Sequence, residues 1–564
     1  MEKRAVLAIV LSLVVVVLWS ILFAPGPPPP EEPPDTASPE VPARPALPTP
    51  NATADATSGS PVTGTPPSPT VSVQVPETLV TIDTGVAQVM LASQGANVKA
   101  VHLSAYKTTL MPGAPPVEIA PVPGAATLPL TAEIHLAERV ISLGRVAFTP
   151  SQTALHLSPS HQEGTIAFRG ELEDGRTVHR LYHFRHGEYT FEVSTWVEGM
   201  PLPPGSSMLV LWGPGLLRHT NDEGRQGQTA EHPRSYVNGK VFDEVPAKAG
   251  ERKSQSGQVA WTALSDTYFT AALMSKEPPG DAVLARRLEG EGEPLTIGLR
   301  TPLTADKARQ TVRVYVGPKD QSLLVAAEPS LDKVIDLGFF SPLARPMLQF
   351  LRFLRSVVHN YGLTIILATI SIKVVFWPLT QTSAKSMQAM QKLQPKLKEL
   401  QARYKDDRQA LNREMMQIYR DNKVNPMGGC LPMVLQIPVF FAFYNALLYA
   451  IELRHAPFVC WQTEVWWIGR GICDLSVYDP SYITPVLMGV TMFFQQKMTP
   501  TTGDPTQAKI MQFMPLMFLM FFLKAPAGLV IYWLVNNILS IGQQMLVNRM
   551  YTPATAQTPA LGKG

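Results

Sequence analysis

Hydrophobic and polar positions repeat with different periods along this chain, and the changes of period divide it into segments. The first segment is an unbroken apolar run over residues 5–23, directly after Lys3 and Arg4. Nineteen residues of α-helix rise about 28 Å, close to the thickness of a bilayer core of about 30 Å. The run lacks the A-x-A-like site of a cleaved signal peptide, the alternative interpretation. We therefore predict a transmembrane anchor at residues 1–24 with a cytoplasmic N-terminus.

The next segments are a linker and a β-rich region. Residues 25–70 are dominated by Pro, Ala, Thr and Ser, a composition that buries too little apolar surface to fold, so we predict a disordered linker. From residue 71 onwards apolar positions alternate with period two, and residues 173–176, Glu-Asp-Gly-Arg, supply a hairpin turn. About 250 residues of such short strands predict one all-β sandwich domain over residues 71–330.

Residues 331–358 change to a helical period. One stripe is apolar and the opposite stripe is basic and polar, and Ser341-Pro342 suits a helix start. Such a helix beside a membrane segment usually lies in the membrane interface, and docking on the β domain is the alternative. The apolar stripe consists of Leu343, Met347, Phe350, Leu351, Leu354 and Val358.

Residues 359–550 are mostly apolar and predict a five-helix membrane core. With the anchor this makes six spans, so the fold class is an α-helical polytopic membrane protein with an external all-β sandwich domain. The fifth span has only 14 residues, about 21 Å of helix, a length that favours a locally thinned bilayer. The five spans of the core are residues 361–380, 429–451, 482–498, 510–523 and 529–547.

Loop charges predict the orientation of these spans. Residues 381–428 carry ten Lys or Arg against five Asp or Glu, whereas residues 452–481 carry two against four. The positive-inside rule places the first loop in the cytoplasm and the second outside. Counting spans from a cytoplasmic N-terminus gives the same result. The β domain is therefore expected outside the cell membrane, and the tail at residues 551–564 inside.

The cytoplasmic segment 381–428 has apolar residues three and four positions apart on two arms, with Asp406-Asp407 suited to the turn between them. This pattern predicts an antiparallel helical hairpin of coiled-coil type. Its outside is basic, either as a solvated face or as a docking surface for an anionic partner such as ribosomal RNA or lipid headgroups. The basic residues are Lys385, Lys392, Lys396, Lys398, Arg403, Lys405, Arg408 and Arg413.

Lys373 lies inside the apolar second span and is the most informative single residue. An ammonium near the bilayer centre costs about 2.5–3.5 kcal/mol on insertion scales. Either its long stem snorkels toward the cytoplasmic interface, or its charge faces a wet cavity lined by protein. Thr369 and Thr380 share its helical face, as a polar groove requires. The other spans add polar groups, whose alternative role is hydrogen bonding between helices. Those assigned to the groove are Gln436, Gln495 and Asn536.

Missing features exclude several classes of function. The predicted spans contain no Asp or Glu, which argues against a proton- or cation-coupled transporter. No P-loop, H-E-x-x-H or G-x-S-x-G motif is present, so we predict no enzyme, no catalytic residue and no cofactor. His179, His183 and His186 lack a carboxylate or cysteine to complete a metal set, and we expect surface residues without metal. The net charge of +3 excludes a wholly basic nucleic-acid binder.

The three cysteines are too few for a disulfide-dense scaffold. Cys430 begins the third span and is expected to be a small buried packing residue. Cys460 and Cys473 both fall in the external loop, where an oxidising compartment allows a disulfide. Two free thiols are the alternative.

The membrane core contains several short motifs, at residues 378–380, 393–396, 425–430, 452–458, 487–498 and 528–532. These motifs resemble those of the YidC membrane-protein insertases of the Oxa superfamily. The six-span layout with a large external β domain is similar to the Gram-negative form of that family. Residues 25–330 match only in architecture.

The resemblance implies an insertase and chaperone of the bacterial inner membrane, working alone or beside the Sec translocon through a hydrophilic groove open to the cytoplasm and the lipid. Lys373 stands where the family usually has arginine, and it keeps the charge without the bidentate fork. Tyr532 and Trp533 stand where the family has groove-facing residues of the sixth span. The implied partners are nascent membrane proteins, the Sec translocon, the ribosome, the signal recognition machinery and the lipid bilayer.

Two other classes of protein remain as alternatives. A small-molecule or lipid transporter with an external binding domain would show specific solute binding and ion coupling. A scaffold for the assembly of other membrane proteins would tolerate a neutral residue in place of Lys373.

Overall fold

The computed structural model describes residues 77–551 with internal gaps. The predicted anchor, the linker and the tail therefore lie outside the described residues, as do Cys430 and Lys405. The gaps are residues 120–126, 138, 200–202, 217–230, 247–249, 277–279, 287–294, 305–308, 405–406, 423, 425–430, 466–468 and 499–504.

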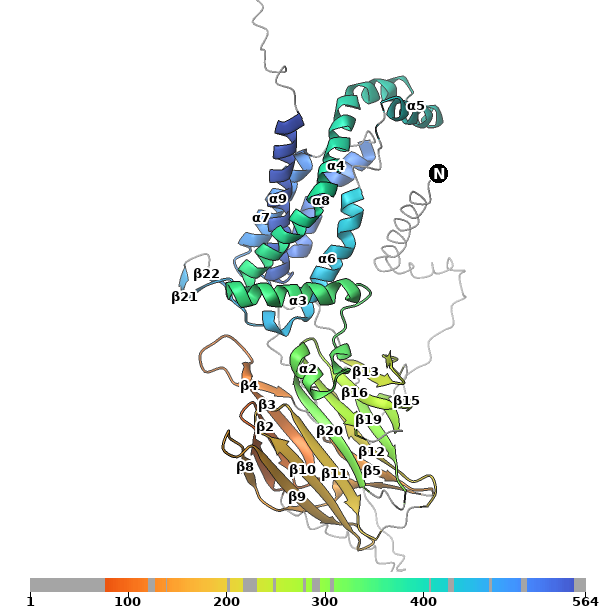
Figure 1. The fold of residues 1–564 in the computed structure, drawn as a ribbon, viewed down its shortest axis with the longest axis vertical. Helices are drawn as coiled ribbons and strands as arrows, with labels where there is room; N and C mark the ends of the chain where they lie inside the picture. The colour runs from red at the N-terminus through yellow and green to blue at the C-terminus, as the bar shows by residue number, and fades with distance from the viewer. Residues whose placement is uncertain are drawn as a thin grey trace, which may run out of the picture. The chain divides into compact units, whose positions relative to one another are not determined.

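The first part of the described chain is built of strands in three sheets, and the two smaller sheets have five and six strands (Figure 1). All pairings within them are antiparallel except the one between β1 and β8. The five-stranded sheet has the order β4 (Pro116–Ile119), β3 (Asn97–Lys107), β2 (Ala87–Ala92), β1 (Leu79–Asp83) and β8 (Ala154–His156). The six-stranded sheet has the order β15 (Arg252–Gly257), β18 (Gly280–Arg286), β19 (Leu295–Pro302), β12 (Ser207–Trp212), β5 (Thr131–His135) and β6 (Val140–Ser142).

The third sheet has nine strands and is antiparallel throughout. Its order is β14 (Lys240–Phe242), β13 (His232–Val237), β16 (Val259–Ser265), β17 (Phe269–Ser275), β20 (Arg309–Pro318), β11 (Thr190–Val197), β10 (Thr177–Arg185), β9 (Glu163–Glu171) and β7 (Phe148–Pro150).

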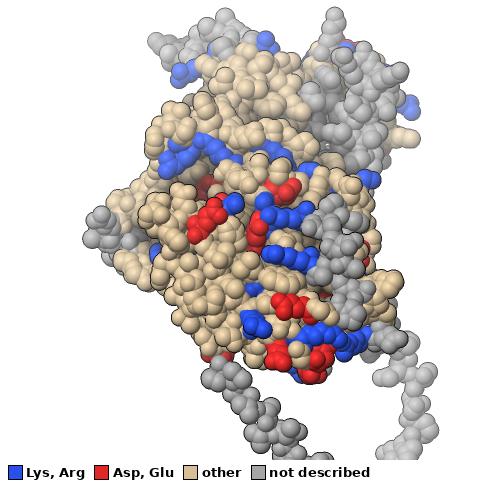
Figure 2. All heavy atoms as spheres, turned by 60° about the horizontal axis from the view of Figure 1, so that its bottom comes forward, with Lys and Arg blue, Asp and Glu red and all other residues tan. Residues whose placement is uncertain are grey.

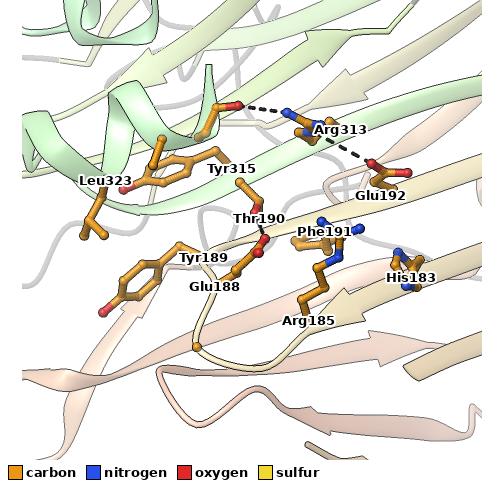
Figure 3. A pocket seen from close by; sticks show the side chains of 13 residues that line it. His183, Arg185, Glu188, Tyr189, Thr190, Phe191, Glu192, Arg313, Tyr315 and Leu323 are labelled. Carbon is orange, nitrogen blue, oxygen red and sulfur yellow. Dashed lines mark hydrogen bonds and ion pairs between the residues drawn. The ribbon is translucent and has the colours of Figure 1, made fainter. Parts of the chain in front are cut away.

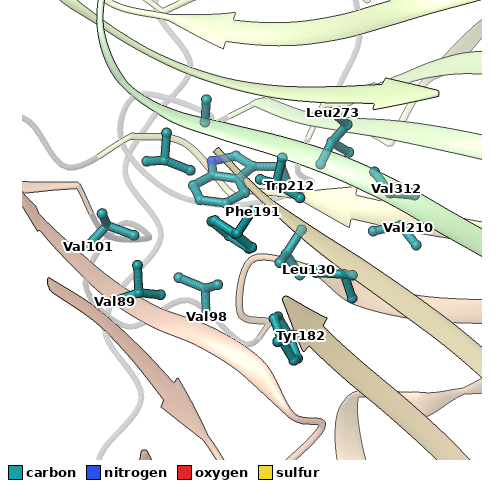
Figure 4. Close-up of a cluster of buried hydrophobic side chains, with 14 of the residues drawn as sticks. Val89, Val98, Val101, Leu130, Tyr182, Phe191, Val210, Trp212, Leu273 and Val312 are labelled. Atoms are coloured by element: carbon teal, nitrogen blue, oxygen red, sulfur yellow. The ribbon is translucent and has the colours of Figure 1, made fainter. Parts of the chain in front are cut away.

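One hydrophobic core joins the three sheets (Figure 4). Val89 comes from the five-stranded sheet, Tyr182 and Phe191 from the nine-stranded sheet, and Trp212 from the six-stranded sheet, and all four are buried. On β10 and β11 buried residues alternate with more exposed ones, as expected of strands with one face on a core. The described residues thus form a β-rich domain in which the smaller sheets pack on the large one.

The hairpin predicted at residues 173–176 is present. β9 and β10 pair antiparallel, beginning with Glu171 opposite Thr177. The turn between them contains Gly175 at φ +78°. This left-handed conformation favours glycine because it has no Cβ to clash.

A buried arginine ties the sheets together. The Arg180 guanidinium on β10 donates hydrogen bonds to the carbonyl oxygens of Gly95 (2.7 Å), Ala96 (3.1 Å) and Leu130 (2.8 Å), and to Asn97 Oδ1 (2.9 Å). The acceptors lie at the turn between β2 and β3 and just before β5. Burial lowers the pKa of Arg180, and the carbonyl dipoles supply the polar partners that a buried charge needs.

After β20 the chain becomes helical. α2 (Gln321–Ala327) is capped by the Asp320 carboxylate, which accepts from the backbone N–H of Ser322 and Leu323. A short 3-10 turn, η2 (Leu331–Val334), precedes α3 (Ser341–Val358), which packs against α4 and α6. The helix begins at the predicted Ser-Pro pair, so residues 331–340 are not part of it.

The buried stripe of α3 differs at one edge from the predicted one. Its buried residues are Ala344, Leu348 and Leu351, whereas the predicted Leu343 is 38% exposed. The polar face also contacts protein, because Arg345 pairs with Asp332 (2.6 Å) and Arg352 with Glu452 (2.7 Å). The periodicity of the sequence does not show these tertiary partners. These ion pairs help to set the rotation of the helix.

The C-terminal part consists of helices and one small hairpin (Figure 1). α4 runs without a break from the second predicted span into the predicted cytoplasmic segment. The elements are α4 (Tyr361–Arg403), α5 (Arg408–Asp421), α6 (Leu431–Tyr449), η4 (Ile451–Leu453), β21 (Val459–Val465), β22 (Gly469–Ile472), α7 (Ile483–Met498), α8 (Pro505–Phe522) and α9 (Ala527–Tyr551).

Two segments of the described chain are long and apolar enough to cross a bilayer, Tyr361–Ser383 and Ala527–Val547. The apolar stretches Leu435–Tyr449 of α6 and Phe513–Phe522 of α8 are shorter. The helical C-terminal part is therefore confirmed, whereas the count of six spans is not.

The helix that contains the predicted fifth span is longer than the span. α8 begins at Pro505 and has 18 residues, whereas the prediction counted only the apolar residues 510–523. The first turns of α8 contain the polar residues Thr506, Gln507 and Lys509. Its apolar stretch among the described residues is Phe513–Phe522, and the short span stays a prediction.

Candidate functional site

Lys373 on α4 has a polar partner on α9. Its Nζ donates a hydrogen bond to Ser540 Oγ at 2.8 Å, and that hydroxyl donates to the backbone oxygen of Asn536 at 2.7 Å. The lysine is half-buried and lies within the apolar segment Tyr361–Ser383. An ammonium in this position thus finds a hydrogen bond inside the bundle, which reduces the penalty of placing it among apolar helices.

Further hydrogen bonds add a third helix and a second contact between α4 and α9. Asn536 Oδ1 accepts from Gln436 Nε2 of α6 at 2.9 Å. Two turns further along α9, Gln543 Nε2 donates to Thr380 Oγ1 of α4 at 2.6 Å. We call the set that these contacts join the interhelical polar network. It consists of Lys373, Thr380, Gln436, Asn536, Ser540 and Gln543.

Four residues of this network, Lys373, Thr380, Gln436 and Asn536, were predicted from the sequence as groove residues. Ser540 and Gln543 were not among the predicted site residues. Asn536, Ser540 and Gln543 are spaced by four and three positions, so they share one face of α9. That spacing was the available signal. A single serine in an apolar helix does not indicate a functional site, because small residues are common where such helices pack together.

Thr369 does not join the network. Its side chain is 1% exposed, and its hydroxyl donates to the carbonyl oxygen of Ile365 at 2.7 Å, one turn back in the same helix. The hydroxyl therefore satisfies its hydrogen bond locally, and the predicted polar stripe of α4 ends at Lys373 on this side. Gln495 lies half-buried on α7.

Tyr532 and Trp533 lie in an aromatic cluster between α6, α8 and α9. Tyr532 is 2% exposed, with its ring centroid 4.5 Å from that of Phe443. Trp533 is half-buried and meets the ring of Phe440 edge-on at 4.8 Å, and its ring lies 5.3 Å from Phe522. The structure thus gives both residues a packing role.

Apolar side chains surround the network on the outside of the bundle. Val374 and Val375, directly after Lys373, are 65% and 72% exposed. α8 and α7 carry similar exposed faces, including Phe513 at 66% and Phe494 at 56%. Apolar surface on this scale is unusual on a soluble protein and indicates contact with lipid or with another apolar partner.

The predicted basic hairpin is exposed where the structure describes it. α4 carries Lys385, Lys392, Lys396, Lys398 and Arg403 on its exposed side, while Leu393 and Leu397 are each 6% exposed. α5 adds the exposed Arg413, and the side chain of Arg408 is outside the described residues. Asp407 caps α5 by accepting from the backbone N–H of Gln409 and Ala410, so the predicted cap is present, whereas Asp406 lies outside the described residues.

The loop between α6 and α7, predicted to be external, contains a disulfide between Cys460 and Cys473, with their Cα atoms 4.7 Å apart. Cys460 belongs to β21, and Cys473 follows β22, the strand with which β21 pairs. Of the two states predicted for these cysteines, the structure has the bonded one.

The described residues contain no group of three or more His, Cys, Asp or Glu placed to hold a metal ion. His179 instead pairs with Glu198 and His183 with Glu163, each at 2.9 Å.

The chain has a β-rich domain followed by apolar helices. These helices enclose a polar network around Lys373 and expose apolar faces. This combination is typical of helical membrane proteins that carry a β-rich domain. Comparisons with known proteins agree. Residues 79–350 match the model of the YidC periplasmic domain, and residues 353–555 match that of the 60Kd inner membrane protein.

Individual relatives cover almost the whole chain. The membrane protein insertase YidC of Syntrophus aciditrophicus is 38% identical over 97% of this chain and 100% of its own length. That of Geobacter sulfurreducens is 37% identical over 99% and 100%. The chain belongs to the YidC family of membrane protein insertases. A crystal structure of an active YidC insertase covers 85% of this chain and 95% of its own, at 16% identity and a TM-score of 0.35, which is too low to support a conclusion.

Proposed function

We propose that this chain moves nascent membrane proteins into the bacterial inner membrane through a polar groove built on the interhelical polar network. The observation that carries the proposal is the hydrogen bond from Lys373 to Ser540. It holds a cationic group between α4 and α9, next to the exposed apolar residues Val374 and Val375. A nascent membrane protein with a polar flank and an apolar segment needs the polar network for its flank and, beside it, the exposed apolar surface for its apolar segment.

The physical argument concerns the polar flank. Moving an acidic or polar tail through lipid is unfavourable because its groups lose their hydrogen bonds to water. Amides and hydroxyls on α4, α6 and α9, with one cation among them, replace part of that hydration. The apolar segment is then free to leave sideways along the exposed faces of α7 and α8 and gain burial in lipid. For acidic tails the membrane potential adds about 2.3 kcal/mol per charge at 100 mV.

The proposal includes six spans, namely the anchor at residues 1–24 and five helices of the core. The termini and residues 381–428 would lie in the cytoplasm, with the β domain in the periplasm. The basic hairpin would recruit the ribosome or signal recognition machinery, and the chain would act alone or with the Sec translocon, also as a folding chaperone. No catalytic step or cofactor is part of this mechanism.

Photo-crosslinking in living cells tests the proposal. Benzoyl-phenylalanine replaces Trp377, a half-buried aromatic residue one turn from Lys373. The bait is a ribosome-bound nascent chain of a short membrane protein with an acidic N-terminal tail. We expect crosslinks that fall several-fold in Lys373→Ala and survive in Lys373→Arg.

A matched control is Lys497→Ala, which removes an exposed lysine from the last turn of α7. It should leave the crosslinks unchanged. Crosslinks that persist in Lys373→Ala would reduce Lys373 to a structural or snorkelling residue. Lipid adducts without any nascent-chain crosslink would overturn the proposal and favour a transporter or a scaffold.

A further inference from the structure

The β domain has a pocket on the side of its large sheet that faces away from the hydrophobic core (Figure 3). Its volume is about 320 Å³, and its wall on one side is α2. The strands β10, β11 and β20 form its floor. Their register places Glu192 between His183 and Arg313, and Thr190 beside Tyr315. These side chains share a face because residues two apart on a strand point the same way.

The carboxylates of the pocket already have partners. Glu192 pairs with Lys276 at 2.5 Å and with Arg313 at 3.8 Å, and Glu188 accepts from the Thr190 hydroxyl at 2.6 Å. Burial raises the pKa of Glu192, but the hydrogen bond and charge of Lys276 outweigh this effect and lower the pKa overall, so the group stays ionised. Arg313 also donates to the carbonyl oxygen of Ala327, at 2.9 Å.

Arg185 is different. It stands at the end of β10, is exposed and lines the pocket. Its backbone pairs with Glu163 of β9, but within the described part of the chain its side chain has no hydrogen bond or ion pair. Figure 3 shows its guanidinium directed toward the space between the three strands. The face of the molecule in Figure 2 carries acidic and basic side chains interspersed, so a long-range field of one sign is absent from that view. Selection in the pocket would therefore rest on the local placement of Arg185.

We propose that this pocket binds an acidic side chain with an apolar neighbour, within an extended polypeptide emerging on the outer side of the membrane. The guanidinium of Arg185 matches a carboxylate in charge and in fork geometry. Tyr189 and Leu323 supply apolar surface for the neighbouring side chain. Glu188 and Glu192 would repel a dianionic phosphate, which a single unpaired cation does not offset.

The inference rests on the proposed function, because an insertase delivers polypeptide tails to this side. Acidic tails are the ones that an inside-negative potential drives outward. A pocket with an unpaired guanidinium on the outer domain would hold such a tail after transfer and oppose its return.

Binding is measured by fluorescence anisotropy with the full chain in nanodiscs of phosphatidylcholine, which has no net charge. The probe is a decapeptide of Gly and Ser with one central Glu-Phe pair and an uncharged dye. We expect at least tenfold weaker binding when the peptide carries Gln-Phe, and the same loss in Arg185→Gln. Equal binding of the two peptides, or full binding by Arg185→Gln, would overturn the inference.

The matched control is Arg169→Gln. Arg169 is exposed on β9 and lies on the same face of the same sheet, because its register partner His179 shares a face with Arg185. Along β10 its register partner His179 is six residues from Arg185, about 20 Å, and Arg169 does not line the pocket. This variant should bind the Glu-Phe peptide like the unchanged chain. Loss of binding in Arg169→Gln would show that only overall charge matters, and would overturn the pocket.

A second experiment separates this inference from the proposed function. Photo-probes replace either Trp377 in the membrane core or Ala326, an exposed residue of α2 that lines the pocket. With an acidic-tailed substrate we expect crosslinks at both positions, and loss at Ala326 alone in Arg185→Gln. Crosslinks at Trp377 without any at Ala326 would overturn the pocket only. Absence at Trp377 would overturn the proposed function, and lipid adducts at Ala326 would assign the pocket to headgroups.

Discussion

At the scale of single residues, Arg180 shows how a charge is accommodated in an apolar core. It is fully buried and makes its hydrogen bonds to three backbone carbonyls and one side-chain amide. Truncation leaves these acceptors unsatisfied and opens a cavity. We expect Arg180→Ala to lower the free energy of unfolding by about 3 kcal/mol or more.

Thermal unfolding of the full chain, followed by tryptophan fluorescence in detergent, measures this effect. The control is Arg169→Ala on the exposed face of β9, which should shift the midpoint little. An equal shift in both variants would contradict the role assigned to Arg180.

Lys319, between β20 and α2, predicts a pH dependence of stability. It is 4% exposed and donates from Nζ to the carbonyl oxygen of Asp266 at 2.9 Å. Burial lowers the pKa of Lys319 from 10.5 to about 8, and the Asp266 carboxylate offsets only part of this shift. Between these two pH values the unfolded chain holds a proton that the native chain has lost. The free energy of unfolding therefore rises with pH in this window, by at most about 1.4 kcal/mol per pH unit.

The free energy of unfolding is measured from pH 7.5 to 10 for the unchanged chain and for Lys319→Met. Tyrosine ionisation affects both proteins equally, so the difference between them reports on Lys319. The stability of the unchanged chain relative to the variant should increase with pH across the window. A constant difference would show that Lys319 keeps an ordinary pKa.

At the scale of elements, the loop between α6 and α7 depends on one covalent link. The bond between Cys460 and Cys473 closes a short loop around β21 and β22, which otherwise form a two-stranded sheet. An isolated hairpin of this kind is marginal in water, and closing a loop of about 15 residues contributes about 3 kcal/mol. We expect Cys460→Ser to increase hydrogen exchange in residues 459–472 at least tenfold.

Cys430→Ser serves as the control for this prediction, since that cysteine takes no part in the disulfide. It should leave the exchange of the loop unchanged. Protection that persists in Cys460→Ser would show that the strands hold without the link.

Helices and single hairpins were predictable from local patterns, whereas the arrangement of the sheets was not. The Glu-Asp-Gly-Arg turn and the Asp407 cap depend on neighbouring residues, so the sequence shows them directly. β11 and β20 pair Thr190 with Tyr315, more than a hundred residues apart, and nothing in either strand specifies that partner. In the site, spacing grouped Lys373 with Thr380, but it also included Thr369, whose hydroxyl bonds to its own helix.

At the scale of the whole molecule, the basic residues of α4 predict a salt-dependent interaction. Lys392, Lys396 and Lys398 are exposed beside the buried Leu393 and Leu397. Replacing the three lysines by Glu should abolish co-sedimentation with empty ribosomes at moderate salt and reduce the salt dependence of binding, since fewer counterions are released. Replacing them by Arg keeps the charge and should keep the binding. Unchanged binding by the Glu variant would show that these lysines do not bind the ribosome and are only a solvated face of the hairpin.

The continuity of α4 also has a mechanical consequence. Its 43 residues form a rod of about 65 Å, with Lys373 about a quarter of the way along and Arg403 at the far end. A tilt of about 5° at Lys373 moves Arg403, about 45 Å away, by about 4 Å. Between Lys373 and Arg403, Pro378 and Pro395 each remove one backbone hydrogen bond of the helix, so the helix bends more easily at these positions. A force applied at the Arg403 end therefore reaches Lys373 as a small rotation, and replacing either proline by alanine would stiffen the helix between the two residues.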